Sequence, residues 1–149
     1  MTSTQRRAVA LAIRHPDAMG LVLGVRRPDD PEDELAGVWG LPAATLAEGE
    51  TEADAVRRLA REKLGLELQD IRLLRSGAQT RPTYRLSMGL YEALVLGEPR
   101  LPPPESRRSD ITYYTGWRWM PARGLTEASN KGSLCARLYL DEVRASRLP

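Results

Sequence analysis

The sequence has few of the residues that usually build disulfides or zinc sites. Cys135 is the single cysteine and His15 the single histidine among 149 residues. A lone cysteine excludes a disulfide within the chain, and one cysteine with one histidine is too small a set for an ordinary zinc site. Any metal ion held by this chain is therefore expected to be bound by oxygen atoms.

Long apolar stretches and a strong excess of one charge are also missing. No segment approaches the roughly 18 consecutive apolar residues that a membrane-spanning helix needs, and the polar start of the chain lacks the apolar core of a signal peptide. The formal net charge is only +2, and the basic residues are scattered. These features predict a cytoplasmic protein that binds a small molecule, not a membrane or a nucleic-acid duplex. The oligomeric state stays open, with a homodimer as one alternative.

Length and composition predict one globular domain over residues 1–149. Apolar residues make up 42% and charged residues 28%, which is ordinary for a folded protein. Short apolar runs predict strands, and the run 84–96 is long enough to carry a bend or bulge near Gly89. The predicted strands are 8–13, 19–26, 38–46, 68–75, 84–96 and 111–120, and a helix is predicted over 133–144. With the helix described next, this order predicts a three-layer α/β/α sandwich with a mixed central sheet.

The clearest helix signal lies in the stretch 53–64. Thr51 is a suitable N-cap with Asp54 three residues later, and Gly65 follows the last apolar position. Apolar residues recur at helical spacing in between. The sequence therefore predicts an amphipathic helix that ends at Gly65.

The most specific pattern in the chain spans residues 44–66. Glu50, Arg58, Glu62 and the pair Gly65-Leu66 stand at fixed distances, after the approach Gly37-Val-Trp-Gly-Leu-Pro42. This pattern resembles the Nudix box: glycine, five residues, glutamate, seven residues, arginine-glutamate, an aliphatic residue, any residue, two glutamates, any residue, glycine and an aliphatic residue. Trp117-Arg-Trp119-Met-Pro121 further along is similar to the tryptophan strand of the same family. The resemblance covers most of residues 8–145 and implies a Nudix-like fold.

The chain departs from the box at three positions. Ala44 stands at the first glycine, Leu59 at the glutamate after the arginine, and Lys63 at the last glutamate. In the family, positions 59, 62 and 63 lie on one helix face, and their glutamates hold Mg²⁺ or Mn²⁺. Here that face has a formal charge of zero where a full box has minus three, so the ion is expected to be held weakly if at all. Restoring both glutamates is predicted to raise the affinity for divalent ions.

The resemblance also assigns roles to individual residues. Glu62 is the expected catalytic carboxylate, with Glu50 and Arg58 as the pair that orients the box. The expected metal ligands are Glu62, a main-chain carbonyl at Ala44 and one acidic residue from outside the box. That outside acid is Asp110, with Glu105 as the alternative. For substrate binding, Lys63 is expected to contact a phosphate, and the aromatic rings of Tyr114 and Trp117 to stack on a base.

Three functional hypotheses remain open at this stage. The resemblance implies a Nudix hydrolase that cleaves a nucleoside diphosphate linked to another moiety with the help of Mg²⁺ or Mn²⁺. The replacements at Leu59 and Lys63 favour instead a nucleotide-binding or regulatory module in which hydrolysis is impaired. A third hypothesis is an enzyme of the same fold with a different reaction, because fold alone does not determine function.

Overall fold

A computed structural model describes residues 4–109 and 111–146 of the chain. The strands are β1 (Thr4–Ile13), β2 (Leu21–Arg26), β3 (Trp39–Gly40), β4 (Ala43–Thr45), β5 (Leu68–Thr80), β6 (Tyr84–Val95) and β7 (Gly116–Pro121). The helices are α1 (Glu52–Leu64), α2 (Thr126–Asn130) and α3 (Leu134–Ser146), with short 3-10 turns η1 (Pro104–Ser106) and η2 (Ala122–Leu125). No helix in the described ranges has the length and apolar character needed to cross a membrane.

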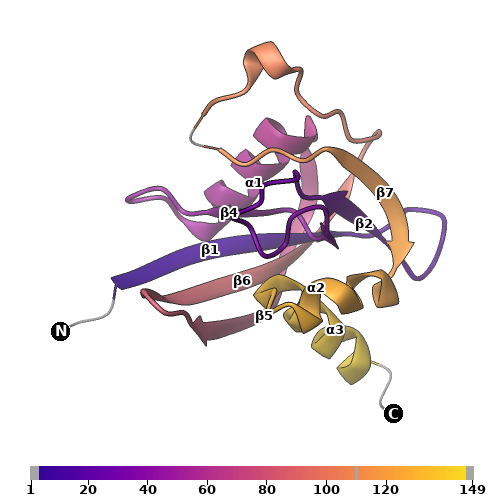
Figure 1. The fold of residues 1–149 in the computed structure, drawn as a ribbon. Coiled ribbons are helices and arrows are strands. Elements are labelled where there is room, and N and C mark those ends of the chain that lie inside the picture. The colour runs from indigo at the N-terminus through magenta and orange to yellow at the C-terminus, as the bar shows by residue number, and fades with distance from the viewer. Residues whose placement is uncertain (1–3, 110, 147–149) are drawn as a thin grey trace.

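The strands form two sheets, and helices lie on both sides of the larger one. One sheet has the order β4-β1-β6-β5 and is mixed, because β1 and β6 run parallel while the other pairs are antiparallel. The second sheet, β3-β2-β7, is antiparallel and is joined to the first by a single bridge between Arg14 and Val22. Helix α1 lies on one side of the β1–β6 pair and α2 and α3 lie on the other (Figure 1). The predicted α/β/α sandwich is confirmed, with its sheet divided in two.

Strand β1 separates two apolar cores. Its large residues Val9, Leu11 and Ile13 belong to the cluster under α1, whereas Ala8, Ala10 and Ala12 belong to the cluster under α3. Successive side chains on a strand point to opposite faces, so one apolar run supplies both cores. Among the strands, helix α3 itself packs mainly against β5 and β6.

Helix α1 has the boundaries that its sequence predicts. The Thr51 hydroxyl accepts a hydrogen bond from the Asp54 amide at 3.2 Å, which satisfies one of the free N–H groups of the first turn. Gly65 ends the helix in the left-handed conformation, with φ of 62°. Its amide returns to the Ala60 carbonyl, and the Arg100 carbonyl lies 3.0 Å from the place of a Cβ atom. Both the cap and the terminal glycine are therefore confirmed.

The predicted strands differ from the observed ones in several places, and β1 and β5 are longer than predicted. The segment 38–46 divides into β3 and β4, because the chain crosses from one sheet to the other at Leu41-Pro42 and proline has no N–H for a ladder. The strand predicted from 111 begins only at Gly116, and the irregularity expected near Gly89 lies instead in the neighbouring strand β5, where Asp70 has φ of 53°. Turn η2 and helix α2 were not predicted, because five residues carry too little periodicity.

Candidate functional site

The loop before α1 is anchored by the ion pair between Glu50 and Arg58. The Arg58 guanidinium donates to both carboxylate oxygens, at 2.8 Å and 2.9 Å, and also to the Thr45 carbonyl at 2.9 Å. The Glu50 carboxylate also accepts a hydrogen bond from the Ala47 amide, at 2.9 Å. The hydrogen bonds from Arg58 hold the pKa of Glu50 below its usual value. This bidentate pair fixes the loop against the helix.

The α1 face expected to hold metal presents only one carboxylate. Leu59 is fully buried in the core beneath α1, and the Lys63 side chain is almost fully buried as well. Glu62 is partly exposed, and its carboxylate lies 3.9 Å from an Arg58 nitrogen. Leu59, which was expected to share a helix face with Glu62 and Lys63, lies in the core, because an apolar side chain at this position packs beneath α1. A glutamate placed at Leu59 would test core packing more than metal binding.

Lys63 points at the main chain of β4. Its Nζ donates to the Ala43 carbonyl at 2.8 Å and lies 5.1 Å from the centre of the Tyr114 ring. The Tyr114 hydroxyl accepts from the Ala43 amide at 2.9 Å and donates to the same carbonyl at 3.2 Å. Burial, reinforced by the charges of Arg27 and Arg58, lowers the pKa of Lys63 to about 8. Two side chains therefore converge on one peptide carbonyl.

The residues described at this place do not by themselves form a site for a divalent ion. A divalent ion such as Mg²⁺ needs several oxygen ligands, commonly carboxylates. In the ranges 4–109 and 111–146, no three His, Cys, Asp or Glu side chains gather closely enough to hold one. Glu105 is exposed in η1, and the predicted ligand Asp110 lies outside the described residues. The carbonyl that Lys63 occupies belongs to Ala43, next to the predicted Ala44.

Ala43 also lines a small cavity. Its volume is about 120 Å³, and its walls are mostly apolar side chains of β6, α3 and the segment from Leu35 to Leu41. The polar groups on its walls come from Arg27, Arg81, Ser133 and Cys135. Arg27 is paired with Asp33 at 2.7 Å, whereas Nε of Arg81 is buried without a hydrogen-bond partner. These residues were not predicted, because they come from three separate segments and follow no common spacing.

The two aromatic residues proposed for stacking do not line this cavity. Tyr114 is almost fully buried behind β4, where its hydroxyl is used by Ala43, and burial raises its pKa to about 12. Trp117 packs edge to face against Trp119, with ring centres 6.4 Å apart. The structure therefore brings Glu50, Arg58, Glu62 and Lys63 together around the box and keeps the aromatic rings in the packing beneath it.

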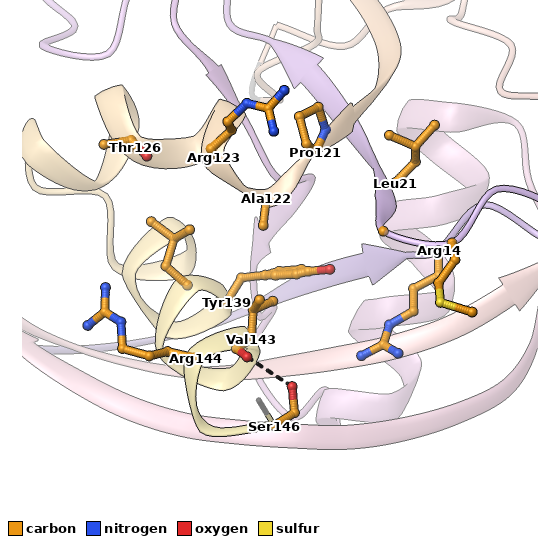
Figure 2. A pocket seen from close by; sticks show the side chains of 13 residues that line it. Arg14, Leu21, Pro121, Ala122, Arg123, Thr126, Tyr139, Val143, Arg144 and Ser146 are labelled. Atoms are coloured by element: carbon orange, nitrogen blue, oxygen red, sulfur yellow. Dashed lines mark hydrogen bonds between the residues drawn. The ribbon is translucent and has the colours of Figure 1, made fainter. Parts of the chain in front are cut away.

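A larger cleft lies elsewhere on the molecule. Figure 2 shows it between α3 and the end of β7, with Arg14, Arg123, Tyr139 and Arg144 on its walls. Its volume is about 1240 Å³, yet none of its lining residues comes from the box. Arg14 is already paired with Glu92 at 2.6 Å. Size alone therefore does not identify the functional site. The residues around Ala43 include the charged side chains of the box, which the larger cleft lacks.

Comparison with known proteins adds an independent finding. The family model described as NUDIX domain matches residues 4–138. The chain is also 38% identical over 87 residues to "Putative 8-oxo-dGTP diphosphatase 2" of Mycobacterium tuberculosis. That match covers 53% of this chain and 56% of the relative, so the chain spans about half the length of the curated relatives it matches.

Solved structures show the same fold. The MutT NUDIX hydrolase of Burkholderia pseudomallei is 26% identical, with a TM-score of 0.63 over 80% of this chain and 85% of that one. The MutT protein of Methanosarcina mazei Go1 reaches a TM-score of 0.73 at 15% identity, over 99% of both chains. The NUDIX domain of Shewanella oneidensis NrtR, solved with ADP ribose, has a TM-score of 0.64 at 19% identity, over 99% of this chain and 90% of that one. With a matched family model over nearly the whole sequence and the fold shared with these structures, the chain belongs to the Nudix domain family.

Proposed function

We propose that this Nudix domain binds a nucleoside diphosphate derivative, with its diphosphate near Lys63 and Arg27 and its less polar end in the cavity beside Ala43. The single observation that carries the proposal is the state of the Lys63 ammonium. It is nearly buried, and its hydrogen-bond acceptor among the described residues is a neutral carbonyl. A buried charge without a paired opposite charge is costly, and an anionic ligand would relieve that cost.

The cavity supports the same proposal from its other side. Arg27 and Arg81 contribute guanidinium groups to its walls, and no Asp or Glu lines it. Guanidinium groups bind phosphate oxygens well, and the apolar walls suit the flat face of a base or a similar group. Because Ala43 both lines the cavity and accepts from Lys63, one ligand could reach both regions.

Hydrolysis of the diphosphate linkage is the second candidate function. Family membership favours it, as does the diphosphatase name of the mycobacterial relative. Glu62 is the box carboxylate available for such a reaction, and it remains partly exposed. The divalent-ion mechanism implied by the family needs more carboxylates than this site offers, so we place binding first and hydrolysis second.

One experiment separates these functions. The intact chain would be incubated with nucleoside triphosphates, nucleotide sugars, ADP-ribose, dinucleoside polyphosphates and coenzyme A, in Mg²⁺, in Mn²⁺ and in EDTA. Both the melting temperature and product release would be measured. We expect at least one diphosphate compound to raise the melting temperature; no shift with any of them would refute the binding proposal. Turnover lost in Glu62→Gln but kept in Glu67→Gln, an exposed control, would establish hydrolysis instead.

A further inference from the structure

Lys63 lies where the family box places its last glutamate, and this exchange reverses the charge of the site. We propose that the Lys63 ammonium is a tethered cation that takes the place of the divalent ion, so that the site binds diphosphates without metal. The inference rests on the proposed function for its ligand. It goes further by assigning the role of the family's metal ion to one side chain of this chain.

The geometry supports this assignment in two ways. First, the Lys63 Nζ lies 2.8 Å from the Ala43 carbonyl, a main-chain oxygen beside the box position where a metal ligand was expected. Second, an ammonium group has three N–H donors, and the described protein supplies one hydrogen-bond acceptor for them. The remaining donors have no acceptor among the described residues, and under this proposal they donate to phosphate oxygens.

The surroundings hold the ammonium in place instead of letting it move into solvent. Lys63 is only 8% exposed, and its Nζ stands over the Tyr114 ring at 5.1 Å from the centre. An aromatic face attracts a cation without neutralising it. The Tyr114 hydroxyl in turn fixes the Ala43 peptide by contacts at 2.9 Å and 3.2 Å. The cation is thus positioned before any ligand arrives, which lowers the entropy cost of binding.

The same arrangement works against a divalent ion. Arg27 and Arg58 lie close enough to affect the charge of Lys63, but each is paired with a carboxylate of its own, Asp33 and Glu50, so Glu62 is the carboxylate nearest to an unpaired cation here. A divalent ion entering here would meet repulsion and an occupied carbonyl. With the glutamate of the family pattern at position 63, the same place would attract the ion.

The first test measures ADP binding to the intact chain by calorimetry, in EDTA and in Mg²⁺. We expect the two dissociation constants to agree within about twofold, and Lys63→Met to weaken binding in EDTA by at least about tenfold. Arg61→Met is the matched control, because Arg61 is an exposed cation two positions earlier on α1. Binding of ADP that requires Mg²⁺ would overturn the inference and leave the proposed function standing. Absence of binding in both buffers, for ADP and for every compound of the panel above, would overturn the proposed function.

The second test needs no nucleotide. Mn²⁺ is titrated into the wild-type chain and into Lys63→Glu, with Arg61→Glu as a control that changes charge equally at an exposed site. We expect measurable Mn²⁺ binding only in Lys63→Glu. Mn²⁺ binding by the wild-type chain at the same site, lost in Glu62→Gln, would overturn the inference. If circular dichroism shows that Lys63→Glu is unfolded, the neutral Lys63→Met variant and the wild-type titration decide the question.

Discussion

The two halves of the box differ in what they preserve. From Ala44 to Arg58 the loop and first turns keep the features that fix their shape: the Thr51 cap and the bidentate Glu50–Arg58 pair. From Leu59 to Gly65 the ending of the helix is kept, but two of the three expected carboxylates are replaced. Leu59 is buried in the core, and Lys63 donates a hydrogen bond to the Ala43 carbonyl.

This difference shows that shape and chemistry depend on separate residues within one motif. The cap, the ion pair and the terminal glycine are satisfied by neighbours inside the segment, so they persist whatever the site binds. The carboxylates repel one another in the absence of an ion, so nothing in the fold alone requires them. Substitutions that weaken each half separately therefore test whether shape and chemistry depend on different residues.

The largest expected effect is a loss of stability when a core residue in the second half of the box is truncated. Leu59→Ala removes a fully buried side chain from the cluster that contains Val9 and Leu11, and should lower the free energy of unfolding by about 2–5 kcal/mol. Urea denaturation measures it. Arg57→Ala on the exposed face of α1 is the control and should change stability little. A small effect of Leu59→Ala would mean that this position is not part of the core.

The next largest effect is expected in the first half. Arg58→Ala removes three hydrogen bonds, to Glu50 and to the Thr45 carbonyl, and leaves a carboxylate of low exposure without its partner. A loss of about 1.5–3 kcal/mol in the free energy of unfolding is expected. Arg61→Ala serves as the control, since its side chain is exposed. Equal stability of the two variants would show that the ion pair does not hold the loop.

A smaller effect is expected at the helix cap. Thr51→Ala removes the acceptor of the Asp54 amide and should cost about 1 kcal/mol of unfolding free energy. Thr51→Ser keeps the hydroxyl and should retain most of that stability. If serine and alanine destabilise equally, the methyl group of Thr51, and not its cap, is the important part.

The smallest expected effect is a dependence on pH. Because Arg58 lowers the folded-state pKa of Glu50 below 4.5, ionised Glu50 stabilises the fold above that pH, and the contribution is lost as pH falls through the folded pKa. The stability difference between the wild type and Glu50→Gln should therefore stay constant near neutral pH and shrink in acid. Denaturation at several pH values measures it, with Glu48→Gln as a charge-matched control at an exposed site. A difference that stays unchanged in acid would contradict the role of the ion pair.

Local signals in the sequence were enough to predict α1 with its cap and its final glycine, since those contacts join residues only a few positions apart. The family pattern also located the Glu50–Arg58 pair. Pattern could not show that Lys63 contacts Ala43, because twenty residues and the loop between β4 and α1 separate them. Nor could it place Arg81 beside Arg27, since their meeting depends on the packing of three elements.

The parallel pairing of β1 with β6 has a consequence for how the chain reaches this structure. The two strands join position 4 to position 84 and continue in register to positions 13 and 93. Contacts so distant in sequence form slowly, because a long loop must close first. During synthesis, α1 is complete well before the strand that closes the sheet beneath it. The helix that carries the box is thus expected to gain its final rigidity only after Val95 has been added, 33 residues after Glu62. The β5–β6 hairpin is therefore part of what positions that carboxylate.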